Sequence, residues 1–448
     1  MTEKNKYILS KDILEEYNSQ RLEQNKNLPV CLAPWKSLRI LPDGNITVCC
    51  HNNSYSLGKF PEVGLLQAWK SDKIQALQKK ISKADFTYGC QVCYPAFKSK
   101  MFDSVNPNLY EEYPKNDDYP VILDFKSATE CNLECIMCSE YSSSSIRKGC
   151  KTGYEEIFDD DFLNQVFEFI PHIKEARFSG GEPFLNRIYY KVWEKILETN
   201  PDCKISIQTN GTILNSEIKS LLESGNFHLN ISIDAIDPDI YSEIRVNGVF
   251  SKLDKNVKYF ADYSQRNNRI LGITACAMKD NSNQYFEILK YANKNNAKIW
   301  FSDVSFPLIN ALWIMSSEAL KEIIETYKYL KIPEDTQLEK QNAIVYRDLL
   351  SRIERLCQNA LLREQSKDNY ISKNDLIKKL QLIFANSIAN NPNVWSKLNT
   401  VFKELPNSDY FDLSLEIKKL YSPDFAYEHF GRLSKENLKQ NFEMLVFE

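Results

Sequence analysis

Residues 121–138 read VILDFKSATECNLECIMC, a short apolar run that leads directly into three closely spaced cysteines. Val121–Phe125 has the composition of a buried strand, and Cys131, Cys135 and Cys138 follow it in a CxxxCxxC arrangement. A structural zinc site usually takes four ligands in two pairs, whereas a cubane iron–sulfur cluster held by three thiolates keeps one iron open to an external ligand. The spacing therefore predicts a loop that wraps a metal cluster, with half of a zinc site as the alternative.

Strand patterns continue beyond this stretch and alternate with helical patterns as far as about residue 305. Six such β/α repeats predict an α/β fold with a partial (β/α)6 TIM-like barrel over residues 115–305, in which the chemistry gathers at the carboxyl ends of the strands. The expected strands are Val121–Phe125, Glu175–Phe178, Lys204–Gln208, Leu229–Ile233, Ile270–Ala277 and Lys298–Ser302. The expected helices between them include Phe162–Ile170, Ile188–Thr199, Ser216–Ser224 and Gln284–Asn293.

The residues before the barrel fall into two parts. Residues 1–30 predict a polar helical lead-in, whereas residues 31–100 are turn-rich and predict a small cysteine-rich α+β domain. Within that domain, strands at Ser37–Leu41 and Asn45–Cys50 flank a Pro-Asp-Gly turn, which is a hairpin signal. One helical stripe, from Leu66 to Ile81, follows the hairpin.

Two further segments complete the organisation of the chain. Residues 106–120 are rich in Pro, Asn and Asp and predict a linker between the cysteine-rich domain and the barrel. Residues 306–448 lack strand patterns and predict a mostly helical C-terminal region, which we interpret as a packing or lid domain.

The composition excludes several classes of protein. The chain has 448 residues and a net charge of −4 from 56 basic and 60 acidic residues, which gives no electrostatic case for a nucleic-acid or anionic-membrane partner. No apolar run approaches the roughly 18 residues that span a bilayer, and the charged N-terminus lacks a signal-peptide core. A cytoplasmic protein is therefore expected. Nine of its 12 cysteines lie between Cys31 and Cys150, a clustering that favours metal binding or catalysis in a reducing compartment.

Four further motifs follow the cysteine loop in chain order. In the first motif, Ser179–Pro183, the paired glycines let the main chain approach a ligand closely, and the proline that ends the motif stiffens the turn. Strand alternation is expected to place Ser232 and Asp234 on one face, and the Arg245 guanidinium is suited to pair with a carboxylate. The motifs are Ser179–Pro183 (SGGEP), Gln208–Thr212 (QTNGT), Ser232–Ala235 (SIDA) and Ile244–Gly248 (IRVNG).

Together with the cysteine loop, these motifs resemble the radical S-adenosylmethionine (SAM) superfamily. The resemblance implies a [4Fe–4S] cluster held by Cys131, Cys135 and Cys138, with SAM bound at the open iron. It also implies reductive cleavage of SAM to methionine and a 5′-deoxyadenosyl radical that abstracts hydrogen from a substrate. Met137 stands where the superfamily often has an aromatic residue, and its thioether is expected to pack on adenine instead. The residues that the resemblance assigns to SAM binding are Gly180, Gly181, Glu182, Pro183, Asn210, Ser232, Asp234 and Arg245.

The earlier cysteines resemble a second module, the auxiliary-cluster domain called SPASM or its shorter twitch form. The resemblance implies a second [4Fe–4S] cluster with Cys31, Cys49, Cys90 and Cys93 as ligands, in a domain that usually follows the barrel but here precedes it. Cys49 and Cys50 would point to opposite faces of a strand, so one of them is expected to ligate. The motif spacing favours Cys49, and Cys50 is the alternative. A structural zinc site is the alternative to the cluster, because the same four thiols satisfy its ligand set.

Three cysteines remain outside both sets apart from Cys50 and Cys150. Such residues usually fill small buried apolar positions. Some radical SAM peptide epimerases use a cysteine as hydrogen donor, and the resemblance makes Cys276 and Cys357 candidates for that role. Cys203 carries no such expectation.

The resemblance identifies the chain as a radical SAM enzyme whose exact reaction the sequence does not define. Auxiliary-cluster modules often accompany crosslinking, epimerisation or oxidation of peptides and proteins, so a peptide or protein substrate is the leading hypothesis. Modification of a carbohydrate or another small molecule is the alternative among enzymes, and a non-catalytic iron–sulfur or zinc scaffold is the alternative from another class. The expected partners are SAM, the substrate and a flavodoxin- or ferredoxin-type electron donor, with neither nucleic acid nor membrane.

Overall fold

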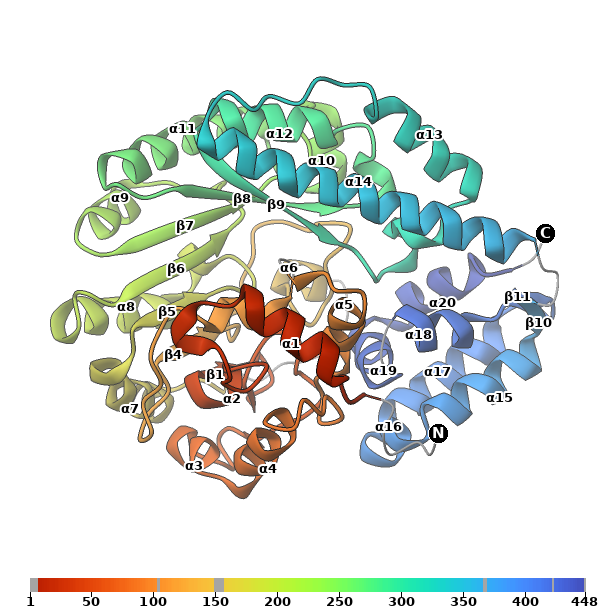
Figure 1. Cartoon of the computed structure of the whole chain (residues 1–448), viewed down its shortest axis with the longest axis horizontal. Helices are drawn as coiled ribbons and strands as arrows, with labels where there is room; N and C mark the ends of the chain where they lie inside the picture. The colour runs from red at the N-terminus through yellow and green to blue at the C-terminus, as the bar shows by residue number, and fades with distance from the viewer. Residues whose placement is uncertain (1–6, 103–104, 149–156, 366–368, 421–422, 447–448) are drawn as a thin grey trace.

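A parallel sheet of six strands forms the centre of the molecule (Figure 1). In this computed structural model, the described residues are 7–102, 105–148, 157–365, 369–420 and 423–446. Neighbouring strands pair in parallel in chain order, which confirms the predicted α/β fold with its partial barrel. The strands are β4 (Ile122–Phe125), β5 (Glu175–Phe178), β6 (Lys204–Thr209), β7 (Phe227–Ser232), β8 (Leu271–Ala277) and β9 (Ala297–Asp303).

Helices cover the outer face of this sheet because its strands alternate in character. In β6, Ile205 and Ile207 are fully buried while Ser206 and Gln208 are half-buried, so the apolar side chains face the helices and the polar ones face the interior. Trp193 illustrates the helix side, where its ring packs against Phe178 with a centroid distance of 5.4 Å. The covering helices are α7 (Asp160–Phe169), α8 (Arg187–Thr199), α9 (Ser216–Glu223), α10 (Pro238–Ile244), α11 (Phe250–Arg266) and α12 (Tyr285–Lys294).

The cysteine-rich segment extends the same sheet. Strand β1 (Ser37–Ile40) pairs in parallel with β4, while β2 (Asn45–Thr47) and β3 (Gly58–Lys59) continue outward in antiparallel pairing. The resulting order is β3-β2-β1-β4-β5-β6-β7-β8-β9. A buried ion pair crosses the junction, with Arg39 Nη1 lying 2.5 Å from Asp124 Oδ2. The hairpin is confirmed, and the sheet is continuous across the boundary that we predict between the two domains.

One long helix was expected after the hairpin, but the structure has α3 (Leu65–Trp69) and α4 (Asp72–Ile81) instead. The break lies at Ser71, whose hydroxyl caps α4 by accepting a hydrogen bond from the backbone of Ile74. A short helix, α2 (Ala33–Lys36), precedes β1 and follows Cys31.

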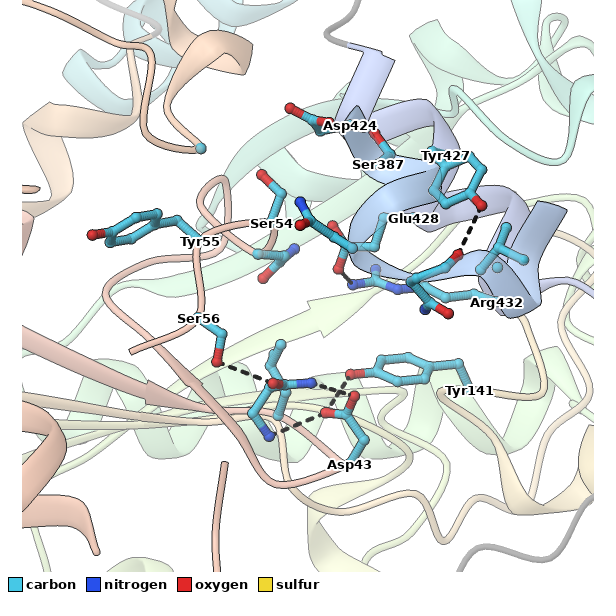
Figure 2. A pocket seen from close by; sticks show the side chains of 18 of the residues that line it. Asp43, Ser54, Tyr55, Ser56, Tyr141, Ser387, Asp424, Tyr427, Glu428 and Arg432 are labelled. Atoms are coloured by element: carbon cyan, nitrogen blue, oxygen red, sulfur yellow. Dashed lines mark hydrogen bonds and ion pairs between the residues drawn. The ribbon is translucent and has the colours of Figure 1, made fainter. Parts of the chain in front are cut away.

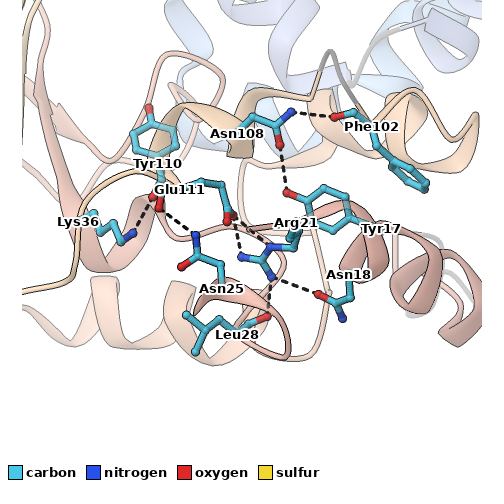
Figure 3. A network of polar contacts seen from close by, with 10 residues as sticks. All are labelled: Tyr17, Asn18, Arg21, Asn25, Leu28, Lys36, Phe102, Asn108, Tyr110 and Glu111. Atoms are coloured by element: carbon cyan, nitrogen blue, oxygen red, sulfur yellow. Dashed lines mark hydrogen bonds and ion pairs between the residues drawn. The ribbon is translucent and has the colours of Figure 1, made fainter. Parts of the chain in front are cut away.

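The segment expected as a linker is packed against the N-terminal residues (Figure 3). Its first part forms the 3₁₀ helix Asn106–Tyr110, and Glu111 then pairs with Arg21, with 2.7 Å between Oε1 and Nη2. Both side chains are almost completely buried. Because a buried ion pair needs well-placed partners, this contact fixes helix α1 (Lys11–Gln20) and the following turn over the cysteine-rich domain.

The C-terminal region is mostly helical, as predicted, and also contains a two-stranded sheet that was not predicted, formed by β10 (Tyr370–Ser372) and β11 (Asp409–Phe411). Helix α14 (Gln337–Glu364) packs against β9 and α12, while the later helices enclose a second apolar core around Leu398 and Phe430. Within the described ranges, no helix is both long and apolar enough to cross a membrane. The other helices of this region are α13 (Ser317–Tyr327), α15 (Lys373–Ile383), α16 (Ala385–Asn390), α17 (Pro392–Glu404), α18 (Leu413–Leu420), α19 (Pro423–Arg432) and α20 (Lys435–Glu443), while α5 (Tyr94–Lys98) and α6 (Ser144–Lys148) are short helices before the second strand of the barrel.

Candidate active site and auxiliary cluster site

A cavity of about 360 Å³ lies at the carboxyl ends of the barrel strands and brings together residues that are far apart in the sequence. All three cysteines of the CxxxCxxC loop line it. Residues from all four later motifs line it as well, which places the cysteines opposite the segments expected to bind SAM. These lining residues are Gly180, Gly181, Asn210, Ser232 and Arg245.

The cysteine loop is held from two sides by hydrogen bonds. On one side, the backbone N–H groups of Glu134 and Ile136 donate to the carbonyls of Val246 and Ile244 at 3.1 and 3.0 Å. On the other side, the Asn210 side chain donates to Asn132 Oδ1 at 2.9 Å. The loop that carries the thiols is therefore tied to the same motifs that line the cavity.

The three thiols suit a metal cluster better than a free state. Cys135 is buried and the other two are half-buried, and burial raises the pKa of Cys138 to about 11. Thiols in such surroundings stay protonated unless a bound metal stabilises the thiolate. Arg245 Nη1 donates to Cys135 Sγ at 3.7 Å, which supplies one cation beside the sulfur. The donor set fits a [4Fe–4S] cluster held by three thiolates.

The two glycines of the SGGEP motif are required by close packing. Gly180 and Gly181 have φ of +87° and +51°, in the left-handed region that favours glycine. A Cβ at Gly180 would lie 2.6 Å from the carbonyl oxygen of Ala128, and one at Gly181 would lie 2.3 Å from that of Glu130. The turn can therefore lie directly against the segment that precedes the cysteines only because both residues lack a side chain.

Glu182 and Pro183, also assigned to SAM binding, are buried behind the cavity wall. The Glu182 carboxylate accepts hydrogen bonds from the Thr209 hydroxyl and the Asn210 backbone, each at 2.7 Å. Burial raises the pKa of Glu182 to about 7, against the opposing effect of these donors. The side chain of Glu182 thus holds the SGGEP and QTNGT turns together.

Ser232 and Asp234 differ in position although both belong to one motif. Ser232 is the last residue of β7 and lines the cavity, where its hydroxyl accepts from Gln208 Nε2 at 2.8 Å. Asp234 lies beyond the strand end and is fully buried. Its two carboxylate oxygens accept from Arg245 Nε at 2.5 Å and from the Cys276 backbone at 2.6 Å. Asp234 therefore positions Arg245 and the end of β8.

Several lining residues of this cavity were not expected from the sequence. Lys126 directly follows β4, and burial, with the neighbouring Arg432 and Arg39, lowers its pKa to about 8. A lysine immediately after a buried strand was the available signal. His429 and Arg432 reach the cavity from α19, and no local pattern marks them, because only the docking of the C-terminal region brings them here.

The cysteines expected to form the auxiliary site lie before α2, after β2 and around the 3₁₀ helix Gln91–Cys93. Burial raises the pKa of Cys49 well above its ordinary value, and the charges of Cys50, Cys90, Cys31 and Cys93 raise it further, so Cys49 lies within electrostatic range of the other four thiols. Burial also raises the pKa of Cys31 to about 12. Such a closed group of thiols fits a metal-bound state.

Polar groups contact several cysteines of the auxiliary site. The Cys50 thiol lies 3.5 Å from Asn106 Oδ1, toward the linker. Two residues that the sequence analysis missed contact expected ligands: Asn52 Nδ2 donates to Cys90 Sγ at 3.0 Å, and His51 Nδ1 lies 3.4 Å from Cys93 Sγ. Such outer contacts orient metal ligands and adjust their basicity.

The remaining cysteines lie in different surroundings. Cys276 lines the cavity of the CxxxCxxC loop, whereas the Cys357 thiol donates to the carbonyl of Ser317 at 3.4 Å in the C-terminal region. Cys203 is buried, and Cys150 falls outside the described residues. Of the two candidate hydrogen donors, Cys276 is the one that shares a cavity with the three cysteines.

Comparison with known proteins gives matches over the barrel and the cysteine-rich segment. Residues 126–292 match the radical SAM superfamily, and residues 31–94 match the iron–sulfur cluster-binding domain SPASM. Among curated relatives, the GTP 3′,8-cyclase of Limosilactobacillus fermentum is 26% identical over 230 residues, which cover 49% of this chain and 64% of that protein. The corresponding enzyme of Nautilia profundicola is 23% identical over 248 residues, which cover 52% and 71%.

Solved structures give weaker likenesses. Native anSMEcpe with bound AdoMet has 20% identity and a TM-score of 0.36, covering 46% of this chain and 59% of that one. Streptococcus suis SuiB bound to S-adenosylmethionine has 13% identity and a TM-score of 0.35, covering 57% and 62%. The chain spans less than two thirds of the length of the first relative and of both of these structures. The two matched domains imply SAM, a [4Fe–4S] cluster and an auxiliary iron–sulfur cluster as cofactors. The chain therefore belongs to the radical SAM superfamily, with its SPASM domain placed before the barrel.

Proposed function

We propose that this chain is a radical SAM enzyme that modifies a peptide or protein substrate by abstracting hydrogen from it. When bound, the cluster and SAM supply a one-electron cleavage that yields methionine and a 5′-deoxyadenosyl radical. The observation that supports this proposal is the convergence of the three loop cysteines, Gly180, Gly181 and Arg245 on one cavity. A scaffold that used the cysteines only for structure would not need such a cavity beside them.

The residues of the cavity have separate tasks in this proposal. Cys131, Cys135 and Cys138 would hold the cluster. Arg245, oriented by the Asp234 carboxylate, would hold the carboxylate of SAM, because a guanidinium presents paired donors to such a group. Asn210 and Ser232 would add polar contacts from the wall formed by the ends of β6 and β7.

A second and larger cavity supports the assignment of a polymeric substrate. It has a volume of about 1040 Å³ and lies between the cysteine-rich domain and the C-terminal helices (Figure 2). Arg432 lines both cavities, so the two adjoin. Small-molecule sites typically measure about 300–1,000 Å³, and the volume of this cavity is slightly above that range. Its lining is rich in amides and hydroxyls, which suit the hydrogen-bonding groups of a peptide backbone.

The relatives named GTP 3′,8-cyclase suggest a nucleotide as the second candidate substrate. The larger cavity is poorly suited to a triphosphate, since four carboxylates line it and would repel the phosphates. Two of its three basic residues also have partners, because Arg432 pairs with Glu428 and the Lys397 ammonium donates to backbone carbonyls. The four acidic residues are Asp43, Glu140, Asp424 and Glu428.

The test is anaerobic reconstitution of the full chain, followed by measurement of metal content and of 5′-deoxyadenosine after addition of SAM and dithionite. Two cubanes would give about eight irons per chain, and 5′-deoxyadenosine should accumulate. Iron near zero with zinc present, or iron-loaded protein that forms no 5′-deoxyadenosine, would contradict the proposal. In the cytoplasm, where we expect this chain to act, a flavodoxin- or ferredoxin-type protein would replace dithionite as electron donor.

A further inference from the structure

The larger cavity is built from the cysteine-rich domain, the loop after Cys138 and the C-terminal helices (Figure 2). The turn between β1 and β2 contributes Asp43, and the loop just after Cys138 contributes Glu140 and Tyr141. The C-terminal helices contribute the opposite wall, which includes Glu428 and Arg432 of α19. A molecule bound between these walls would contact all three parts and would lie beside the cavity of the three cysteines.

Most charged groups of this cavity already have partners. Asp43 Oδ1 accepts from the Tyr141 hydroxyl and from the Asn45 backbone, each at 3.2 Å. Arg432 pairs with Glu428 and lies over the Tyr141 ring at 4.6 Å from its centroid. Asp424 accepts a hydrogen bond from the Ser387 hydroxyl. These groups form the walls of the cavity, and their existing contacts leave them few hydrogen bonds to offer a ligand.

Lys397 lies on the opposite wall, within electrostatic range of Glu140. Its ammonium donates to the carbonyls of Gly431 and Leu433 at 2.7 and 2.6 Å. Among the ion pairs of the described residues, none joins Lys397 to Glu140 within 4.0 Å. Lys435, the third basic residue, is exposed at the rim.

Two acceptors of the cavity have no hydrogen-bond partner. Glu140 is only 8% exposed, and its Oε1 atom is buried without a donor. The Oδ1 atom of Asn53, from the cysteine-rich domain, is also buried without a donor. Among the described residues that line this cavity, every such orphaned side-chain atom is an acceptor. Buried polar atoms are normally satisfied, so these two acceptors favour a ligand that brings N–H donors.

We propose that this cavity binds the substrate through a cationic group, an ammonium or a guanidinium, whose N–H groups donate to Glu140 and Asn53. The inference rests on the proposed function, and the group would be a lysine or arginine side chain of the peptide. A stacked aromatic pair, Tyr55 and Tyr88 with ring centroids 5.0 Å apart, lines the same cavity and can cover the aliphatic part of such a side chain. Because Glu140 lies two residues after Cys138, the bound cation would fix the substrate next to the reacting centre.

The test compares two variants of the full reconstituted chain by calorimetric titration in the presence of SAM. Glu140→Gln removes the charge and keeps the shape, while Glu62→Gln is the control, an exposed carboxylate outside the cavity. The probes are acetyl-Gly-Lys-Gly-amide, its glutamine analogue and 1,4-diaminobutane. The unmodified chain should bind the lysine peptide about ten-fold or more tightly than the glutamine peptide. Glu140→Gln should remove most of that preference, and Glu62→Gln should keep it.

Each outcome has a defined meaning. Equal affinity for the lysine and glutamine peptides, or an unchanged preference in Glu140→Gln, would overturn the proposal. Diamine binding that depends on Glu140 would support the cation site and identify a small amine as its source. If Glu140→Gln does not fold, Asn53→Asp serves instead, because an added carboxylate should tighten binding of the lysine peptide and weaker binding would overturn the proposal. Binding does not require SAM cleavage, so a chain that binds the lysine peptide but forms no 5′-deoxyadenosine would contradict only the proposed function.

Discussion

The two cysteine sites of this molecule are built in opposite ways. The CxxxCxxC site takes three thiols from one short loop and leaves them on the wall of a cavity that also carries Gly180, Gly181 and Arg245. The auxiliary site would take its thiols from Cys31 to Cys93, a stretch that also includes three strands of the sheet, with Cys49 and Cys93 buried and Cys31 and Cys90 half-buried. One site is local in sequence and open, and the other is distributed and closed.

This difference predicts that the loss of a metal-ligating cysteine has a different effect at each site. A loop that is held by its own hydrogen bonds to Val246, Ile244 and Asn210 can keep its fold without metal, so the loss should appear in chemistry. A closed site whose ligands come from several elements links metal binding to folding, so the loss should appear in stability as well.

The largest effect is expected from Cys138→Ala. Formation of 5′-deoxyadenosine should fall by about 100-fold or more, since even changes outside the ligand set of a metal site cost about 10–100-fold. The Tm should change little, because the loop contacts remain. Cys203→Ala is the matched control, a buried cysteine outside both sites. Product assays and thermal unfolding of both variants, run anaerobically, check this prediction, and a Tm loss as large as that of an auxiliary-site variant would break the contrast.

Cys90→Ala tests the closed site. The iron content should fall from about eight to about four per chain, and the Tm should drop by about 5 °C or more, because bound metal contributes to folding there. Metal analysis and thermal unfolding measure both quantities. A fall in zinc rather than iron would identify the auxiliary site as a zinc site, and an unchanged Tm would show that the site does not stabilise the domain.

The barrel could be predicted from the sequence because its strands are short apolar runs with distinct motifs at their ends. The prediction of side-chain positions is less accurate beyond the ends of the strands, where the alternation of side chains no longer applies. Alternation along a strand correctly places Ser232 on the cavity wall, but β7 ends at that residue, and Asp234 turns behind Arg245. Helix α11 carries Leu253, Val257 and Phe260 at helical spacing and was overlooked.

The contribution of the C-terminal region could not be predicted from local patterns. His429 and Arg432 lie on a helix whose apolar residues pack into their own core, so nothing in the nearby sequence indicates a second role. Their place at the cavity results from docking of one domain on another. The cysteine-rich segment shows the same limitation, since its pairing with β4 through β1 depends on tertiary structure.

Asp234→Asn tests whether the open site depends on the positioning of Arg245. The neutral amide holds Arg245 less firmly, so the KM for SAM should rise about ten-fold, while kcat should change less. Asp239→Asn, an exposed residue of α10, is the control. Steady-state kinetics with varied SAM separate the two parameters. An equal loss in kcat with unchanged KM would mean that Asp234 does not act by positioning Arg245.

The smallest effect is expected from Cys50→Ala, in comparison with Cys49→Ala. The Cys50 thiol donates to Asn106 Oδ1, and its removal takes away one weak hydrogen bond. Cys50→Ala should therefore keep about eight irons per chain and nearly the original Tm, whereas Cys49→Ala should lose about four irons. Because the two residues are adjacent in the chain, general damage to the domain would affect both variants alike. Opposite results would assign the ligand to Cys50, and a loss of iron in both variants would mean that the closed site tolerates no change at this turn of the chain.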